Sequence, residues 1–399
     1  MSLAADVKLF RYTDGGAPTL NGAAGSLSSL LYTCLVTGYN VKTPGSITRD
    51  GSTVTVTFAS AHGYLLYSVI RVSGAEQEDY NGDFRVTSVA TNSLTIELAA
   101  GVTPTTPATG TIETRFAPAG WTREFNGTNV SVFKSSDSDA TGCRMRVDDS
   151  GTLWTTVRGY ISMTDVDTGV EPFPPSQSLY WHKSSDTGTT RQWVLVADSK
   201  AFYFGNVPDG SYGRLHTFGD IITYKPGDVY HCLLSGNSST SGADYLQDVL
   251  IEKNFTHEWV TPVRLVVARD YGGVENMPGY LATIGVKMTS VYNIHSSPIG
   301  GVGLSYPHPT DNGFVYGNVF FKEYNSSLSL LRGYPPGLYD PWHAVLAALG
   351  SVDTIINNVP ASGRKAILWR VYYSRIIGSE SLGATDGNAM LDIIGPWRE

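Results

Sequence analysis

The sequence predicts a mainly β protein: a β-sandwich-like main domain with one or two short helices and an inserted small all-β module. Three observations indicate this fold class. Short segments rich in β-branched and aromatic residues recur along the chain, separated by turn-forming residues. The 399 residues include 43 glycines and 20 prolines, and only 16% are charged, where about a quarter is typical. No regular alternation of strand and helix patterns occurs, which argues against a doubly wound α/β fold.

Two hairpins near the middle of the chain give the clearest strand patterns. In each hairpin an Asp at the turn bonds its own backbone, and polar residues separate two strand-like runs. The runs are Arg144–Val147 with Thr152–Tyr160, and Arg191–Ala197 with Ala201–Phe204. Both alternating faces of the segment 193–197 are apolar, which predicts a central strand covered on both sides.

The best helical pattern lies at Ser26–Val36, where apolar residues recur at intervals of three and four. We expect Ser26 to cap the start of this helix and Gly38 to end it. A second short helix is expected around His343–Leu349. An eleven-residue helix is marginal alone, so the first should lie on a sheet.

Residues 44–114 differ from the rest in containing closely spaced short strand patterns with Asp-Gly, Ser-Gly and Asn-Gly turns. They predict a small Ig-like or barrel module inserted into the main domain, which comprises residues 1–43 and 115–399. Asn126-Gly127 further on predicts a type I′ hairpin turn. Residues 160–177 are expected to form a long connection. Lys225–Asp228 should form a turn between two strands.

Charge and hydropathy exclude several function classes. The net charge is −8, and no basic run is present to neutralise nucleic-acid phosphates. No apolar stretch approaches the roughly 20 residues of a membrane-spanning helix, and residues 1–8 do not resemble a secretion signal. The odd number of cysteines argues against a disulfide scaffold, and free buried thiols are expected.

The carboxylates offer two kinds of candidate site. Asp165, Asp167 and Glu171 surround a Gly turn and could gather oxygens on Ca²⁺, although six or more oxygens are needed. Adjacent Asp148 and Asp149 could serve glycoside hydrolysis, but neighbouring residues of a turn usually point apart. No complete catalytic constellation is present, so we expect that the protein is not an enzyme and needs no cofactor.

Aromatic residues near predicted loops offer a binding function instead. Tyr180, Trp181, Tyr334 and Trp342 are the candidates, since exposed aromatic rings stack on sugars or anchor protein partners. The alternative is that these rings are buried at the ends of the sheets.

Two resemblances indicate a source. The segments Ala61–Tyr64, Val72–Ala75 and Tyr80–Val86 resemble small β-domains inserted into phage structural proteins. The rest of the chain resembles structural proteins encoded in the tail regions of Mu-like and related tailed bacteriophages. The residues that resemble this family are Thr19–Leu27, Arg146–Thr152, Gly159–Gly169, Tyr180–Lys183, Phe218–Asp220 and Ile393–Trp397. The family provides no catalytic residues to carry over.

The resemblance implies a virion structural protein of the tail, baseplate or neck, assembled in the host cytoplasm through contacts with other virion proteins and copies of itself. One alternative is a receptor- or glycan-binding virion protein that recognises a host-surface glycan. Others are a capsid decoration protein and a cell-envelope hydrolase. Neither nucleic acid binding nor membrane insertion is expected.

Overall fold

The computed structural model describes residues 5–210, 213–237, 240, 263–268, 277–283, 316–325, 328–341, 353–356, 364–377 and 380–398. This part of the chain is mainly β, as predicted. Its helical segments are α1 (Ser26–Tyr32), the π-helical η1 (Thr33–Thr37) that continues it, and the 3₁₀ turn η2 (Glu78–Tyr80). None of the described helices is long and apolar enough to cross a membrane. The second expected helix, around residue 343, lies outside the described residues.

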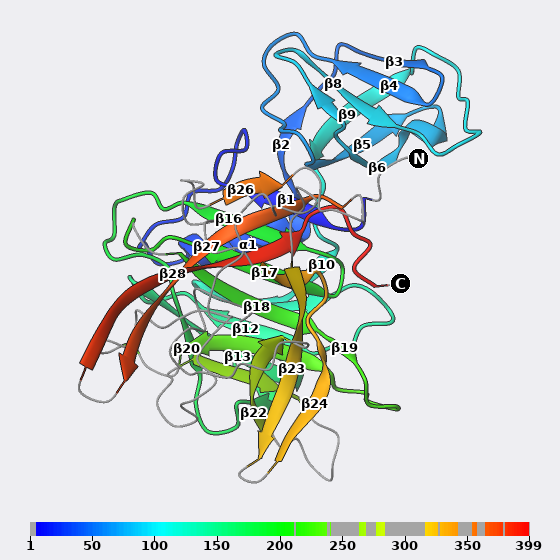
Figure 1. Ribbon diagram of the computed structural model, residues 1–399. Helices are drawn as coiled ribbons and strands as arrows, with labels where there is room; N and C mark the ends of the chain where they lie inside the picture. Colours follow the sequence, from blue (N-terminus) through cyan, green and yellow to red (C-terminus); the bar gives the residue numbers. More distant parts are fainter. Residues whose placement is uncertain are drawn as a thin grey trace, which may run out of the picture.

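Most strands belong to one large antiparallel sheet (Figure 1). Its strands in chain order are β1 (Lys8–Arg11), β10 (Trp121–Asn126), β11 (Val130–Ser135), β12 (Arg144–Asp148), β13 (Trp154–Met163), β14 (Gly169–Phe173), β15 (Leu179–His182), β16 (Trp193–Ala197), β17 (Ala201–Asn206), β18 (Arg214–Asp220), β19 (Ile222–Thr223), β20 (Cys232–Asn237), β21 (Val263–Val267), β22 (Met277–Thr283), β23 (Tyr316–Asn325), β24 (Leu328–Tyr334), β25 (Leu338–Pro341), β26 (Asp353–Ile356), β27 (Ala366–Ile377) and β28 (Glu380–Asp392). The two predicted hairpins are confirmed, because β12 pairs with β13 and β16 pairs with β17.

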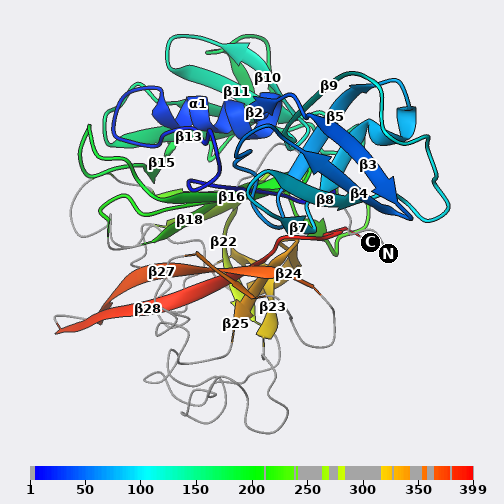
Figure 2. The same ribbon diagram turned by 90° about the horizontal axis from the view of Figure 1, so that it is seen from above.

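Strand β16 lies in the middle of the molecule and is covered on both faces, as its sequence predicts. Val194 and Val196 pack in one apolar cluster with Ile367 of β27 and Leu391 of β28. Leu195 and the other alternate residues pack in a second cluster with α1 and with β11–β13. Figure 2 shows the consequence: α1 lies over one side of β16, and β27 and β28 lie under the other.

The segment between η1 and β10 forms two smaller sheets. One consists of β2 (Tyr39–Lys42), β5 (Val69–Ala75), β6 (Gly82–Arg85) and β9 (Gly110–Phe116), and the other of β3 (Ser46–Asp50), β4 (Thr53–Thr57), β7 (Ser88–Val89) and β8 (Ser93–Glu97). In the described residues, neither sheet pairs with a strand of the large one. Figure 1 shows these strands together at one end of the molecule. The predicted module boundaries, residues 44–114, stay a prediction; β2 and the end of β9 lie outside them but share a sheet with the module.

The start of α1 corrects the predicted helix cap. The residue before the helix is Gly25, which has no side chain to cap the helix. The Ser26 hydroxyl donates instead to the carbonyl of Asn21 at 2.6 Å. The carboxylate of Asp149 accepts the free amides of Leu27 at 2.8 Å and Ser28 at 3.0 Å. A carboxylate is favoured at this end of a helix, because unpaired amides give it partial positive charge. Gly38 ends the helical segment as predicted, with φ of 70°.

Asp149 also pairs with the ammonium of Lys183, and both side chains are fully buried. The hydroxyl of Thr155 donates to the same carboxylate at 2.6 Å, and Lys183 donates to the carbonyl of Ala23 at 2.9 Å. Two charges are thus removed from water. The free-energy cost of burying them is offset by hydrogen bonds with α1, β13 and the loop before the helix. This Asp149 network joins the helix to the large sheet.

Two local predictions are wrong. Gly127 does not adopt positive φ; Asn129 does, with φ of 57°, so the β10–β11 connection is not a two-residue type I′ turn. Residues 160–177 are not only a connection, because β13 extends to Met163 and pairs with β14. The Asp165–Thr168 segment is therefore the tip of a hairpin. Its position explains the acidic residues there, which favour tight turns.

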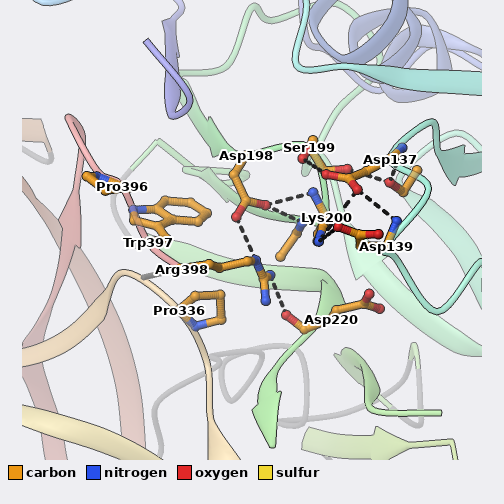
Figure 3. A network of polar contacts seen from close by, with 12 residues as sticks. Asp137, Asp139, Asp198, Ser199, Lys200, Asp220, Pro336, Pro396, Trp397 and Arg398 are labelled. Carbon is orange, nitrogen blue, oxygen red and sulfur yellow. Dashed lines mark hydrogen bonds and ion pairs between the residues drawn. The ribbon is translucent and has the colours of Figure 1, made fainter. Parts of the chain in front are cut away.

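The last described residues pack against the β16–β17 turn (Figure 3). Arg398 donates from Nε to Asp198 at 2.9 Å and from Nη2 to the carbonyl of Asp220 at 2.6 Å. The indole of Trp397 donates to the carbonyl of Asp392 at 3.0 Å. A Cβ at Gly337 would overlap the Trp397 ring, so only glycine allows this approach. The bond from Arg398 to Asp198 attaches the end of this segment to the turn at 198–200.

Arg85 of β6 links the small sheets to this terminal segment. The guanidinium is almost completely buried and donates to the carbonyls of Tyr67 and Ile393, both at 2.8 Å, and of Val7 at 2.7 Å. It also donates to Ile394 at 3.4 Å. Burial lowers the pKa of Arg85 to about 10. The guanidinium remains charged at neutral pH and acts as a clamp between segments distant in sequence.

His182, at the end of β15, is buried and stacks on Trp154 with ring centroids 4.3 Å apart. Burial, together with the nearby Arg214, lowers the pKa of His182 to about 4. The ordinary value is about 6.5, so the unfolded chain binds this proton more readily than the folded protein. The resulting stability is present above pH 6.5 and is lost as the pH falls toward 4.

When the pH falls from 7 to 4, the free energy of unfolding of the wild type should fall further than that of His182→Gln. The expected difference between the two losses is up to about 3 kcal/mol. Asp14 opposes the effect in both proteins, because burial raises its pKa to about 6 and favours its protonated form in the folded state. The difference between the two proteins therefore cancels the Asp14 contribution and leaves that of His182 with its coupling to the buried His216. Urea unfolding at a series of pH values measures it, and parallel stability curves would contradict the prediction.

Candidate docking surface

The candidate carboxylates do not share one site. Asp148 is partly exposed beside Arg146, with N–O distance 3.3 Å, whereas Asp149 is buried in the network with Lys183. Asp165 accepts the amides of Asp167 and Thr168, both at 2.8 Å, and these bonds lower its pKa. Asp148 and Asp149 thus have separate structural partners.

The calcium candidates Asp165, Asp167 and Glu171 are all exposed. Asp167 pairs with Arg146 at 2.8 Å, and Glu171 has a positive φ of 52° on β14. Throughout the described ranges, no group of three or more His, Cys, Asp or Glu side chains is arranged to hold a metal ion. The calcium site therefore stays a prediction from the sequence.

The candidate aromatic residues do not form one exposed site either. Trp181 is fully buried, donates from its indole to the carbonyl of Ser235 at 2.7 Å, and stacks on His216. Of the two alternatives for these rings, burial holds for Trp181, because alternate residues of β15 face the core. Tyr180 and Tyr334 are half-buried, and Trp342 lies outside the described residues. Tyr334 is the candidate that belongs to an exposed cluster.

That cluster includes the loop of residues 224–229, called here the Tyr224 loop, between β19 and β20. Tyr224 is 50% exposed and Val229 is 53% exposed, and Leu331 on β24 is 43% exposed. The ring of Tyr224 lies 5.7 Å from that of Tyr334 and 6.4 Å from that of Phe320 on β23. Partial burial and the neighbouring Tyr334 raise the pKa of Tyr224. An exposed aromatic ring packed beside other aromatic residues is typical of a binding surface.

A buried ion pair holds the Tyr224 loop in place. Asp228 and Arg332 lie 2.5 Å apart between oxygen and nitrogen, with side chains 0% and 4% exposed. Asp228 also accepts the hydroxyl of Thr223 at 2.9 Å, and that hydroxyl accepts the amide of Lys225 at 3.1 Å. The loop is therefore ordered before any partner arrives, which reduces the entropy that binding would cost.

Backbone pairing of β19 with β24 fixes the rings relative to each other. Ile222 pairs with Tyr334 and Thr223 with Gly333, and the amide of Tyr224 donates to the carbonyl of Arg332 at 2.9 Å. A Cβ at Gly333 would overlap the carbonyl oxygen of Ile222. Only glycine permits the two strands to approach this closely.

The sequence predicts the turn at Lys225–Asp228 but does not single out Tyr224, Val229 or Leu331. The turn is confirmed. The sequence does not reveal the Asp228–Arg332 ion pair, because the two residues are far apart in the chain and no local pattern links them. A tyrosine directly before a Lys-Pro-Gly-Asp turn is the one local clue, because residues at turns are usually exposed.

No family model and no curated protein matches the sequence. Among solved structures, the chain is similar to phage phi92 endosialidase, with 13% sequence identity and a TM-score of 0.18. The similarity covers 89% of this chain and 52% of that one, so this chain spans about half the length of that protein. A similarity of this size establishes neither the fold nor the function of this chain.

Proposed function

We propose that the protein is a structural component of a bacteriophage virion, in the tail, baseplate or neck, and that it acts by protein–protein contact and not by catalysis. The sequence resemblance to phage tail-region proteins supports a bacteriophage origin for the chain. The contact function rests on one observation, the exposed and preordered Tyr224 loop. The proposed partners are other virion proteins or further copies of this chain.

The Tyr224 loop has the properties of an interface anchor. Tyr224 presents a large ring at low entropic cost, and Val229 in the same loop and Leu331 on β24 are further exposed apolar residues of this region. Aromatic residues contribute a large share of binding energy where they become buried between proteins. A stable interface buries roughly 1,200–2,000 Å², so surrounding residues must contribute as well.

We expect Tyr224→Ala to weaken attachment to the particle by about 30-fold, corresponding to about 2 kcal/mol for a central aromatic anchor. Val229→Asp should weaken it as well, because it places a charge in the apolar contact. Quantitative mass spectrometry of purified particles, after complementation with each variant, measures the attachment. Val170→Asp is the matched control, since Val170 on β14 is also 51% exposed but lies on a different strand pair. Equal incorporation of all variants would overturn the assignment of this surface.

A second candidate function is glycan binding at the same aromatic cluster. The half-exposed ring of Tyr224 beside Tyr334 favours it, because tyrosine faces stack on sugar rings. A glycan array probed with the wild type and Tyr224→Ala distinguishes the two. Binding that is lost in the variant supports the glycan function, and absence of binding by both proteins supports the structural one.

A further inference from the structure

Two of the three cysteines meet inside the core. Cys143 and Cys232 are both buried and free, and the thiol of Cys143 lies near enough to Cys232 to raise the pKa of the Cys232 thiol. They come from different parts of the large sheet, since Cys143 immediately precedes β12 and Cys232 begins β20. Both side chains belong to the same apolar cluster. The contact is therefore between two nucleophilic groups that are remote in the sequence.

The backbone independently brings these two segments together. Thr141 donates to the carboxylate of Asp220 from its amide at 2.8 Å and from its hydroxyl at 2.5 Å. Asp220, the last residue of β18, pairs directly with Cys232 of β20. The segment that contains Cys143 is thus attached to the strand pair that contains Cys232, which places the two thiols on neighbouring segments.

We propose that Cys143 and Cys232 form an intramolecular disulfide when the protein meets a peroxide oxidant, and that Cys34 takes no part in it. The sulfur of one cysteine attacks one oxygen of hydrogen peroxide, an S–O bond forms as the O–O bond breaks, and the displaced oxygen leaves as water to give a sulfenic acid. The second sulfur then attacks the first, the S–S bond forms, the S–O bond breaks, and a second water leaves. Two electrons pass to the peroxide, and both thiol protons end in the waters.

The surroundings make this reaction selective and slow. Burial raises the pKa of the Cys232 thiol well above its ordinary value, and the contact with Cys143 raises it further. Few thiolates therefore form at Cys232 at neutral pH, so its own attack on the oxidant is slow. Once one sulfenic acid forms, the neighbouring thiol is already in contact with it. Cys34 lies on another element, η1, and is also buried, and burial raises the pKa of its thiol well above its ordinary value.

The experiment treats the full-length protein with hydrogen peroxide and then blocks the remaining thiols. Peptide mapping by mass spectrometry should find a Cys143–Cys232 cross-link, with two of the three free thiols lost. Cys34→Ser should give the same cross-link, and Cys143→Ser and Cys232→Ser should give none. The oxidised wild type should also show a higher thermal midpoint, because the bond closes a long loop.

Three results would overturn the proposal: a cross-link that includes Cys34, oxidation of Cys143 or Cys232 to sulfinic acid without a cross-link, or no loss of thiols when the peroxide is in large excess. Loss of the cross-link after unfolding in urea before oxidation, with scrambled pairings in its place, would support the folded contact as its cause. The proposal does not depend on the function of the Tyr224 loop. Failure of one leaves the other standing.

Discussion

Asp149→Asn should destabilise the folded protein by roughly 3–5 kcal/mol, because breaking a buried ion pair leaves one charge uncompensated. The variant leaves the ammonium of Lys183 fully buried without its counter-charge. It also replaces the carboxylate that accepts the amides of Leu27 and Ser28 at the start of α1. Chemical denaturation followed by circular dichroism measures the loss.

Asp148→Asn is the matched control, because it makes the same change one residue away. Asp148 is about one-third exposed and pairs with Arg146 at 3.3 Å, so its loss should cost less than about 1 kcal/mol. If Asp149→Asn does not fold, Thr155→Val tests the same network more gently, since it removes one hydrogen bond to Asp149 and should cost roughly 1–3 kcal/mol. Equal small losses for Asp148→Asn and Asp149→Asn would contradict the stabilising role of the Asp149 network.

Arg85→Met should cost about 3 kcal/mol and loosen the small sheets from the terminal segment. The methionine keeps the apolar stem but leaves the carbonyls of Val7, Tyr67 and Ile393 without their donor. The cost is smaller than the sum of these bonds, because the buried guanidinium itself is poorly solvated, as its lowered pKa indicates. Denaturation measures the total, and hydrogen exchange at residues 393–394 measures the local loosening.

Arg71→Met on the neighbouring strand β5 is the control for that experiment. Its side chain is 43% exposed and pairs with Asp83 at 2.7 Å, so we expect a loss below about 1 kcal/mol and unchanged exchange at residues 393–394. Faster exchange at these residues in both variants would show that the effect is not specific to Arg85.

The local parts of the fold were predictable from sequence, because their causes lie within a few residues. The apolar run of β16 predicted its burial on both faces, and the spacing of leucines predicted α1 with an end at Gly38. The helix cap was not predictable in this way. Its acceptor, Asp149, lies 122 residues from Leu27, and Ser26 is a good capping residue that the fold uses elsewhere.

The candidate site was less predictable, because exposure depends on the whole fold. Tyr180 and Trp181 are adjacent and similar in composition, but only the strand register places Trp181 in the core and leaves Tyr180 half-exposed. The acidic run at Asp165–Glu171 is conspicuous for its charge, but the structure explains it through a hairpin turn and a pairing with Arg146. The Tyr224 loop required knowledge of the Asp228–Arg332 pair, which no local pattern contains.

The contacts of Arg85 with Ile393 and Ile394 can form only late in the synthesis of the chain. A ribosome releases residues 44–114 early, and their strand pairings are mostly local, so these sheets can form while the rest of the chain is still being made. The acceptors at Ile393 and Ile394 emerge more than three hundred residues later. Until then the Arg85 guanidinium can bond only the carbonyls of Val7 and Tyr67, and the link between the small sheets and the terminal segment cannot form.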